Sequence, residues 1–177
     1  MTTTSTEARP LRDCPPSPSY DHQLRRVLLA SEGRPFRTEV LRCAAELLTK
    51  EGARAHVISI ARVYGSSFGL PNPGLLPTKR EFEQQEKQVS DAVIWLRRRG
   101  ITASGQVVGT RKGAQRICQE AGSMASEAIV MGADPDRNWL TAELMWSQEP
   151  QRVRRRAKVP VHLIVGCQTP SRGQRRP

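Results

Sequence analysis

The sequence contains few aromatic residues, no long apolar run and fewer acidic than basic residues. Only 5% of its 177 residues are aromatic, and hydrophobic residues make up 37%. Apolar runs such as residues 159–165 fall far short of the roughly 20 residues that a membrane-spanning helix needs. The N-terminus also lacks the apolar segment of a signal peptide. We therefore expect a cytoplasmic protein with an aliphatic core and no membrane association.

The four cysteines form neither a metal motif nor a disulfide framework. Cys14, Cys43, Cys118 and Cys167 are widely spaced, without a CxxC pair or a neighbouring histidine cluster. Such spacing gives no reason to expect zinc or structural disulfides. Cys43 and Cys118 fall within helical patterns, where cysteine usually serves as a small core residue.

No catalytic motif is recognisable, so we do not expect an enzyme. The sequence shows no Ser/His/Asp, Cys/His or paired-carboxylate pattern. His56 and His162 lie in predicted strands, where we expect satisfied core or edge histidines. Asp134 and Asp136 lie close together in a polar loop, which is common for turn-forming acids, and we expect no metal site.

Basic residues exceed acidic ones, and arginine supplies most of them. The net charge is +11, and the 28 basic residues divide into 23 arginines and 5 lysines. One interpretation is an arginine-rich, solvated surface. The other is an anionic partner such as nucleic acid. Arg154, Arg155, Arg156 and Lys158 form a short basic run on or after the last predicted helix.

Strand and helix patterns alternate along the chain. Strands are predicted at 23–31, 55–63, 101–108, 127–131 and 159–165, and helices at 35–50, 78–99, 114–121 and 148–157. This order predicts an α/β fold with a doubly wound, five-stranded parallel sheet and helices on both faces. We expect one domain over residues 23–166, a disordered tail at 1–22 and a basic tail at 167–177.

Local signals mark the ends of these elements. Gly52 and Gly100 lie where C-terminal caps belong. Thr78 followed by Glu81 is the signature of a capping box, and Ser147 is a suitable N-cap for the last helix. Glycines and prolines fill residues 65–77, and glycines bound residues 109–113, so we predict a loop and a turn there.

Three segments resemble the universal stress protein family in order and spacing. They are RRVLLASEGRPFRTEVLRCAAELLTKEGARAHVISI at 25–60, VVGTRKGAQRICQEAGSMASEAIVMGA at 107–133 and AKVPVHLIV at 157–165. The resemblance extends from about Arg25 to Gly166. It implies a fold like that of the adenine nucleotide alpha-hydrolases and a regulatory or interaction role in a bacterial stress response.

The resemblance also locates a nucleotide site and shows where this chain departs from it. Nucleotide-binding members carry an acidic residue after the first strand and Gly-x-x-Gly-(nine residues)-Gly-(Ser/Thr) after the fourth. Glu32 matches the acid, Gly132 matches the first glycine, and Ser147 matches the last position if the loop has one extra residue. Pro135 stands near the second glycine and has no N–H to donate, while Trp146 adds bulk near the third. An altered or lost ATP site is therefore implied.

The expected nucleotide cleft includes residues on both sides of this loop. Its members are Glu32, Ile60, Met131, Gly132, Arg137 and Ser147. Arg137, Arg152 and Arg154 offer side-chain phosphate contacts where backbone contacts are lost. If a cofactor binds, the resemblance implies ATP.

Family members commonly dimerise by pairing the last strand, which implies a homodimer here. The corresponding interface residues are Val159, Val161, Leu163, Ile164 and Val165, and an exposed edge strand supplies the physical reason for pairing. The sequence does not identify a further protein partner. Two other functions stay open: an ATP- or AMP-binding switch with slow or no hydrolysis, and a nucleic-acid-binding protein that uses its basic residues.

Overall fold

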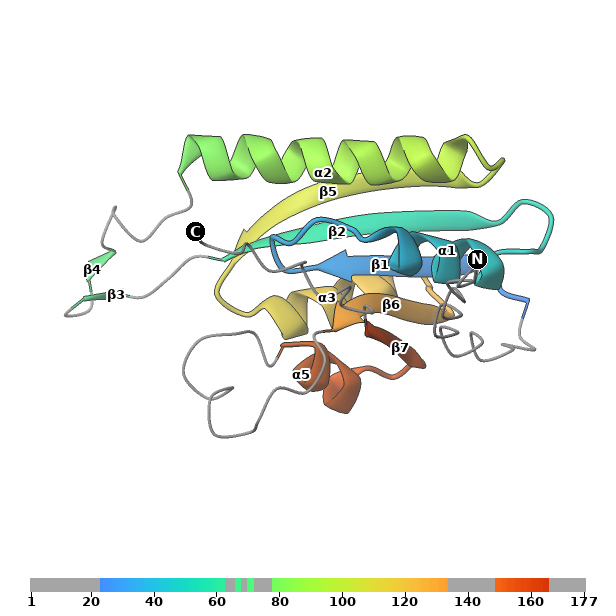
Figure 1. The fold of residues 1–177 in the computed structure, drawn as a ribbon. Coiled ribbons are helices and arrows are strands. Elements are labelled where there is room, and N and C mark those ends of the chain that lie inside the picture. Colours follow the sequence, from blue (N-terminus) through green and yellow to red (C-terminus); the bar gives the residue numbers. More distant parts are fainter. Residues whose placement is uncertain (1–22, 63–65, 68–69, 72–77, 134–148, 166–177) are drawn as a thin grey trace, which may run out of the picture.

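The computed structural model describes residues 23–62, 66–67, 70–71, 78–133 and 149–165. Five parallel strands form the central sheet in the order β5-β2-β1-β6-β7 (Figure 1). They are β1 (Arg26–Ser31), β2 (Arg54–Arg62), β5 (Thr102–Thr110), β6 (Ala128–Ala133) and β7 (Val161–Val165). The predicted five-stranded parallel sheet is therefore confirmed.

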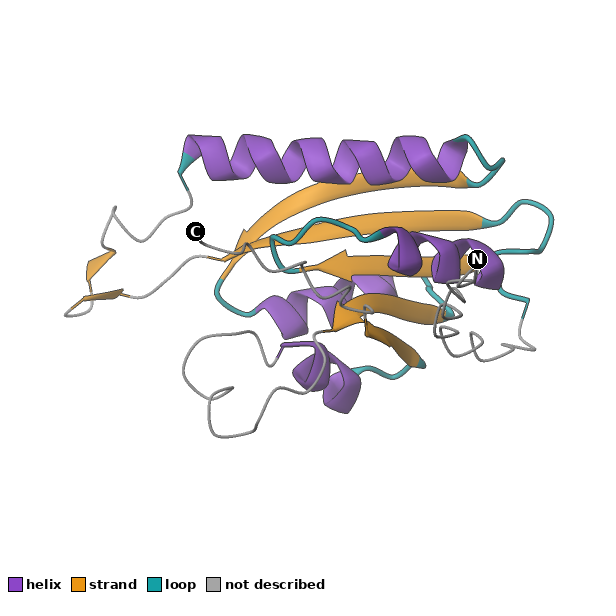
Figure 2. Cartoon of the chain, viewed as in Figure 1, coloured by secondary structure: helices purple, strands orange, loops and turns teal. Residues whose placement is uncertain are grey.

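Helices cover both faces of the sheet, as the doubly wound prediction requires. They are α1 (Thr38–Leu47), α2 (Lys79–Arg97), α3 (Gly113–Ser123) and α5 (Glu149–Arg156). The helices α1 and α2 pack on one face of the sheet and α3 and α5 on the other, and Figure 2 shows these helices and strands in the view of Figure 1. No helix in the part of the chain that the structure describes is long and apolar enough to cross a membrane.

The core consists of two apolar clusters separated by the sheet. One cluster lies between the sheet and helices α1 and α2 and is called the α1/α2 cluster. The other lies between the sheet and helices α3 and α5 and is called the α3/α5 cluster. Val27 and Leu29 of β1 face the α1/α2 cluster, whereas Leu28 and Ala30 face the α3/α5 cluster. All four side chains are at most 1% exposed. β1 thus has the continuous apolar sequence of a strand that is covered on both faces.

Helix α2 begins with the predicted capping box and packs directly against the backbone of β5. The Glu81 N–H donates to Thr78 Oγ1 at 3.2 Å, and the Thr78 N–H donates to Glu81 Oε2 at 2.7 Å. Further along, a Cβ added to Gly105 would lie 2.5 Å from Cγ1 of Val89 and 3.1 Å from Cγ2 of Val93. Glycine at 105 therefore permits the close approach of α2.

Helix α1 is shorter than predicted. Arg37 has extended backbone angles, so the helix begins at Thr38, and it ends at Leu47. Gly52 consequently does not cap α1. Gly52 instead lies in the turn that leads into β2. Its φ of +72° is a left-handed conformation, which favours glycine.

Two segments predicted as turn or loop contain strand residues. β5 extends to Thr110 because Gly109 and Thr110 continue the pairing with the end of β2. Within 65–77, β3 (Ser66–Ser67) pairs antiparallel with β4 (Leu70–Pro71). Turn-rich composition predicted a loop at 65–77 but not this short ladder. The tails predicted at 1–22 and 167–177 lie outside the described residues.

Candidate functional site

The carboxyl ends of the neighbouring strands β1 and β6 lie where the strand order reverses, which is where ligands bind in open α/β sheets. Ser31 at the end of β1 shapes the following loop. Its hydroxyl donates to the Arg34 carbonyl at 2.6 Å and accepts from the Arg34 N–H at 3.1 Å. The loop thus makes a tight turn at the edge of the candidate cleft.

A half-buried glutamine of α2, Gln85, supports this loop. Ser59 of β2 is completely buried and donates to Gln85 Oε1 at 3.0 Å. The amide nitrogen of Gln85 lies so near Gly33 that an added Cβ would be 2.9 Å away. Gly33 also has φ of +70°. The backbone conformation therefore favours glycine directly after Glu32, and a larger residue there would also displace the Gln85 amide.

The predicted cleft residues occupy different environments. Glu32 is half-buried in the loop after β1, and Gly132 is exposed near the end of β6. Ile60 and Met131 are 0% and 1% exposed, and their side chains pack in the α3/α5 cluster. Only their backbone groups are therefore able to border a cleft. Arg137 and Ser147 lie outside the described residues, as do Asp134, Pro135, Asp136 and Trp146.

Packing does not require glycine at position 132. A Cβ there would meet only Cγ2 of Val40, at 3.5 Å, which is an ordinary van der Waals contact. Its φ also lies outside the positive range that favours glycine. The effect of Gly132 is instead to leave exposed backbone at the switch point of the sheet.

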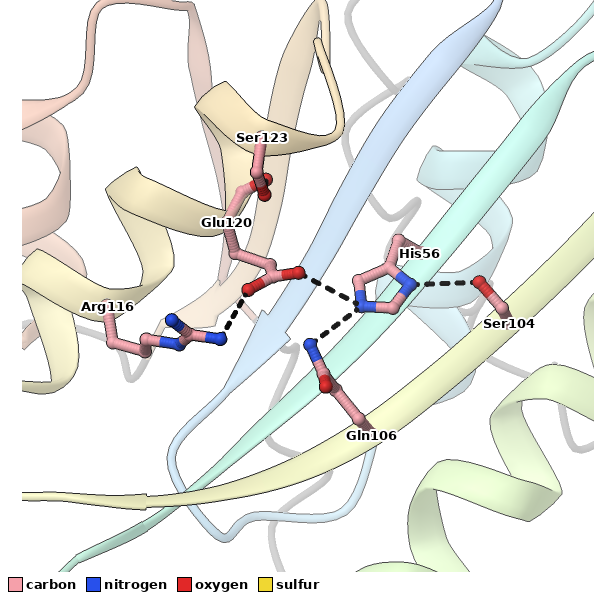
Figure 3. A network of polar contacts seen from close by, with 6 residues as sticks. All are labelled: His56, Ser104, Gln106, Arg116, Glu120 and Ser123. Atoms are coloured by element: carbon pink, nitrogen blue, oxygen red, sulfur yellow. Dashed lines mark hydrogen bonds and ion pairs between the residues drawn. The ribbon is translucent and has the colours of Figure 1, made fainter.

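A second polar cluster lies toward the amino-terminal ends of the strands (Figure 3). His56 of β2 is 9% exposed, and its Nδ1 lies 2.9 Å from the Ser104 hydroxyl. Nε2 of His56 is 3.3 Å from the Gln106 amide nitrogen and 3.8 Å from Glu120 Oε1. The second Glu120 oxygen pairs with Arg116 at 2.9 Å.

Burial favours the neutral form of His56 at pH 7. With the Gln106 amide in this orientation, Nε2 accepts a hydrogen bond and Nδ1 donates to Ser104. Burial lowers the pKa of His56 below 6.5, while the nearby Glu120 carboxylate opposes that shift. The expectation of a satisfied core or edge histidine is therefore confirmed for His56, and the cluster joins α3 to two strands.

The described residues offer neither a reactive thiol nor a cluster suited to a metal. Burial raises the pKa of the Cys43 thiol to about 11, and burial also raises the pKa of Cys118. Both thiols therefore stay protonated at neutral pH. Within the described ranges, no group of three or more His, Cys, Asp or Glu side chains is placed to hold a metal ion.

The two edges of the sheet differ. On the β5 edge, Arg97 donates from Nε and Nη2 to the Ala103 carbonyl at 2.9 and 2.7 Å. On the β7 edge, Val165 is 53% exposed. Val161, Leu163 and Ile164 are partly exposed. Val159 precedes β7 and packs against the α3/α5 cluster.

Comparison with known proteins agrees with this fold. Residues 23–165 match the model of the universal stress protein family. A universal stress protein from Archaeoglobus fulgidus is 21% identical, with a TM-score of 0.58 over 78% of this chain and 91% of its own. A family member from Burkholderia pseudomallei is 22% identical, with a TM-score of 0.57 over 80% and 96%.

A third solved structure is the Archaeoglobus fulgidus universal stress protein in complex with dAMP. It is 19% identical, with a TM-score of 0.57 over 80% of this chain and 98% of its own. The curated proteins include no significantly similar sequence. Because the family model covers 143 of 177 residues, from 23 to 165, the chain belongs to the universal stress protein family.

Proposed function

We propose that this protein is a homodimeric, non-catalytic regulatory module of a bacterial stress response, with β7 as the contact between subunits and an altered nucleotide site. The observation that carries this proposal is the contrast between the sheet edges. Arg97 covers backbone on the β5 edge, whereas β7 presents partly exposed aliphatic side chains on its edge. Unprotected edge strands pair readily with another strand.

The backbone direction of β7 suits a symmetric contact. Pro160 O accepts from the Ile129 N–H of β6 at 2.9 Å, so this carbonyl points into the sheet. Because backbone direction alternates along a strand, Val161, Leu163 and Val165 point their N–H and C=O groups outward. An antiparallel β7 from a second copy would meet the same groups about a two-fold axis.

Val165→Lys tests this contact, because Val165 is the most exposed apolar residue of the edge. Ile164 is less suitable, since it packs against the α1/α2 cluster and a lysine there would also disturb the core. Ile94→Lys on α2 is a matched control, because Ile94 is 44% exposed and lies far from β7 in the sequence. We expect Val165→Lys to shift the protein to monomer in sedimentation velocity. A dimer unchanged by Val165→Lys, or lost equally in both variants, rejects the β7 interface.

A second candidate function is an adenine-nucleotide switch. It is favoured by the exposed Gly132, which packing does not require. The similar solved structures also include the dAMP complex and a universal stress protein in complex with cAMP, which is 14% identical with a TM-score of 0.54. Against it, Pro135 and Trp146 interrupt the family's glycine pattern.

Calorimetry with ATP and AMP, with and without Mg²⁺, separates the two functions. The altered-site proposal expects no binding tighter than about 100 μM, which is about −5.5 kcal/mol. Gly132→Ala adds a methyl group to the exposed backbone while its Cβ keeps an ordinary contact distance. Tighter binding that Gly132→Ala abolishes would establish the switch instead.

A further inference from the structure

Charge is distributed unevenly among the four described helices. α1 contains one basic and two acidic residues, α2 contains four of each, and α3 contains one of each. α5 contains four arginines and one glutamate, and the exposed Lys158 lies two residues after its end. The excess positive charge of the helical layers is therefore concentrated at α5.

The geometry of α5 directs this charge outward. Val153 is completely buried and packs in the α3/α5 cluster. At 100° per residue, Arg155 lies nearly opposite Val153, and Arg152 and Arg154 flank it on the outer side. All three arginines are exposed. Arg156 lies nearer to α3, where its charge acts on Cys118.

Two of the outer cations, Arg154 and Arg155, differ in their ion pairing from several of the described basic residues of α2 and α3. On α2, Lys79 and Lys87 have acidic partners at i+4, and Arg116 on α3 pairs with Glu120. Among the described residues, Arg154 and Arg155 form no ion pair. Favourable interaction with the C-terminal end of the α5 dipole explains some of the arginines. It does not explain the absence of acidic residues from the outer face.

The chemistry of this face fits phosphate better than a lipid surface. Guanidinium groups bind phosphate through two parallel N–H donors. A membrane-binding helix also needs an outward apolar face, but Val153 is buried, and Ala157 and Val159 pack against the core. Residues 149–165 contain no Phe, Tyr or Trp, so the aromatic stacking typical of single-strand binders is missing here.

We propose that the outer face of α5, formed by Arg152, Arg154, Arg155 and Lys158, binds the phosphate backbone of a nucleic-acid duplex without reading its sequence. Three or four phosphate contacts give a slope of about −3 for log K against log salt concentration. The proposal does not depend on the nucleotide cleft or on the β7 contact.

The test is fluorescence anisotropy of the full chain with a labelled 20-base-pair DNA duplex at several salt concentrations. Arg154→Glu/Arg155→Glu reverses two charges on the outer face. Arg80→Glu/Arg98→Glu is the matched control, because it reverses two exposed charges at the ends of α2 and gives the same net charge. We expect the α5 variant to lose at least tenfold in affinity and the control to lose less than threefold.

Circular dichroism checks that both variants fold. If Arg154→Glu/Arg155→Glu does not fold, Arg154→Gln/Arg155→Gln takes its place. The proposal is overturned if the α5 variant and the control lose affinity equally, or if the duplex affinity is insensitive to salt. It is also overturned if anionic phosphatidylserine vesicles bind more tightly than the duplex and depend on the same two arginines, because the partner would then be a membrane.

Discussion

Replacing Gly105 with alanine tests how closely α2 packs on the sheet. The added Cβ would lie 2.5 Å from Val89 Cγ1, whereas carbon atoms in contact normally stay about 3.5–4.0 Å apart. The Val57 carbonyl oxygen, 3.1 Å away, restricts movement of the strand toward its neighbour. Relief therefore requires α2 to move outward or Val89 to leave its rotamer. Overpacking of this kind costs about 1–3 kcal/mol, or about 2–12 °C in Tm for a domain of this size.

The assay is urea and thermal unfolding followed by circular dichroism. Gly132→Ala is the matched control, since its Cβ would meet only Val40 at 3.5 Å. Val89→Ala alone removes two buried methyl groups and should cost about 1.6 kcal/mol. Combined with Gly105→Ala, it also removes the clashing atom. The double variant should then be more stable than the two single effects predict, by about 1–3 kcal/mol. Strict additivity, or equal losses for the two glycines, would refute the close-packing argument.

Two further predictions concern His56 and Thr78. The folded-state pKa of His56 is lowered, so as pH falls the unfolded chain takes up a proton on this histidine before the folded chain does. His56 therefore lowers the free energy of unfolding as pH falls below about 6.5, and it makes that free energy no more pH-dependent above this value. In urea unfolding between pH 5 and 8, His56→Gln should weaken that acid-side loss, and an unchanged pH profile would contradict the assignment. Thr78→Ala removes the N-cap acceptor of α2 and should cost about 1 kcal/mol. Thr78→Ser should retain most of that stability, whereas an equal loss in Thr78→Ser would show that capping is not the cause.

Local sequence signals predicted most of the fold. The capping box at Thr78 and Glu81 depends on residues three positions apart, and the apolar run of β1 identifies a strand buried on both faces. Errors occurred where tertiary pairing prevailed over local composition. Gly109 belongs to β5 because β2 continues beside it, and no local pattern contains that information.

The candidate sites were harder to predict because they depend on distant partners. The Ser104 hydroxyl that binds His56 is 48 residues away in the sequence. A polar alternation of Ser104 and Gln106 in one strand, together with a histidine in another, is a signal that could have suggested the cluster. Ile60 and Met131 turn their side chains into the core, as apolar residues of a strand covered on both faces do, so only their backbone groups reach the edge. Residue type predicted where the strands end. The geometry of the sheet determines which backbone and side-chain atoms lie at the carboxyl ends of the strands.

The Arg97 contact with the Ala103 carbonyl bears on the size of any assembly that forms by pairing of edge strands. A sheet with two open edges permits head-to-tail addition, in which each new copy offers another free edge and growth continues as a fibre. Here the guanidinium occupies a backbone acceptor on one side. In the proposed dimer, pairing through β7 would use the other edge of both copies and leave two β5 edges, each with its Ala103 carbonyl already occupied. If the subunits pair in this way, the Arg97 contact would favour a closed pair over an open filament.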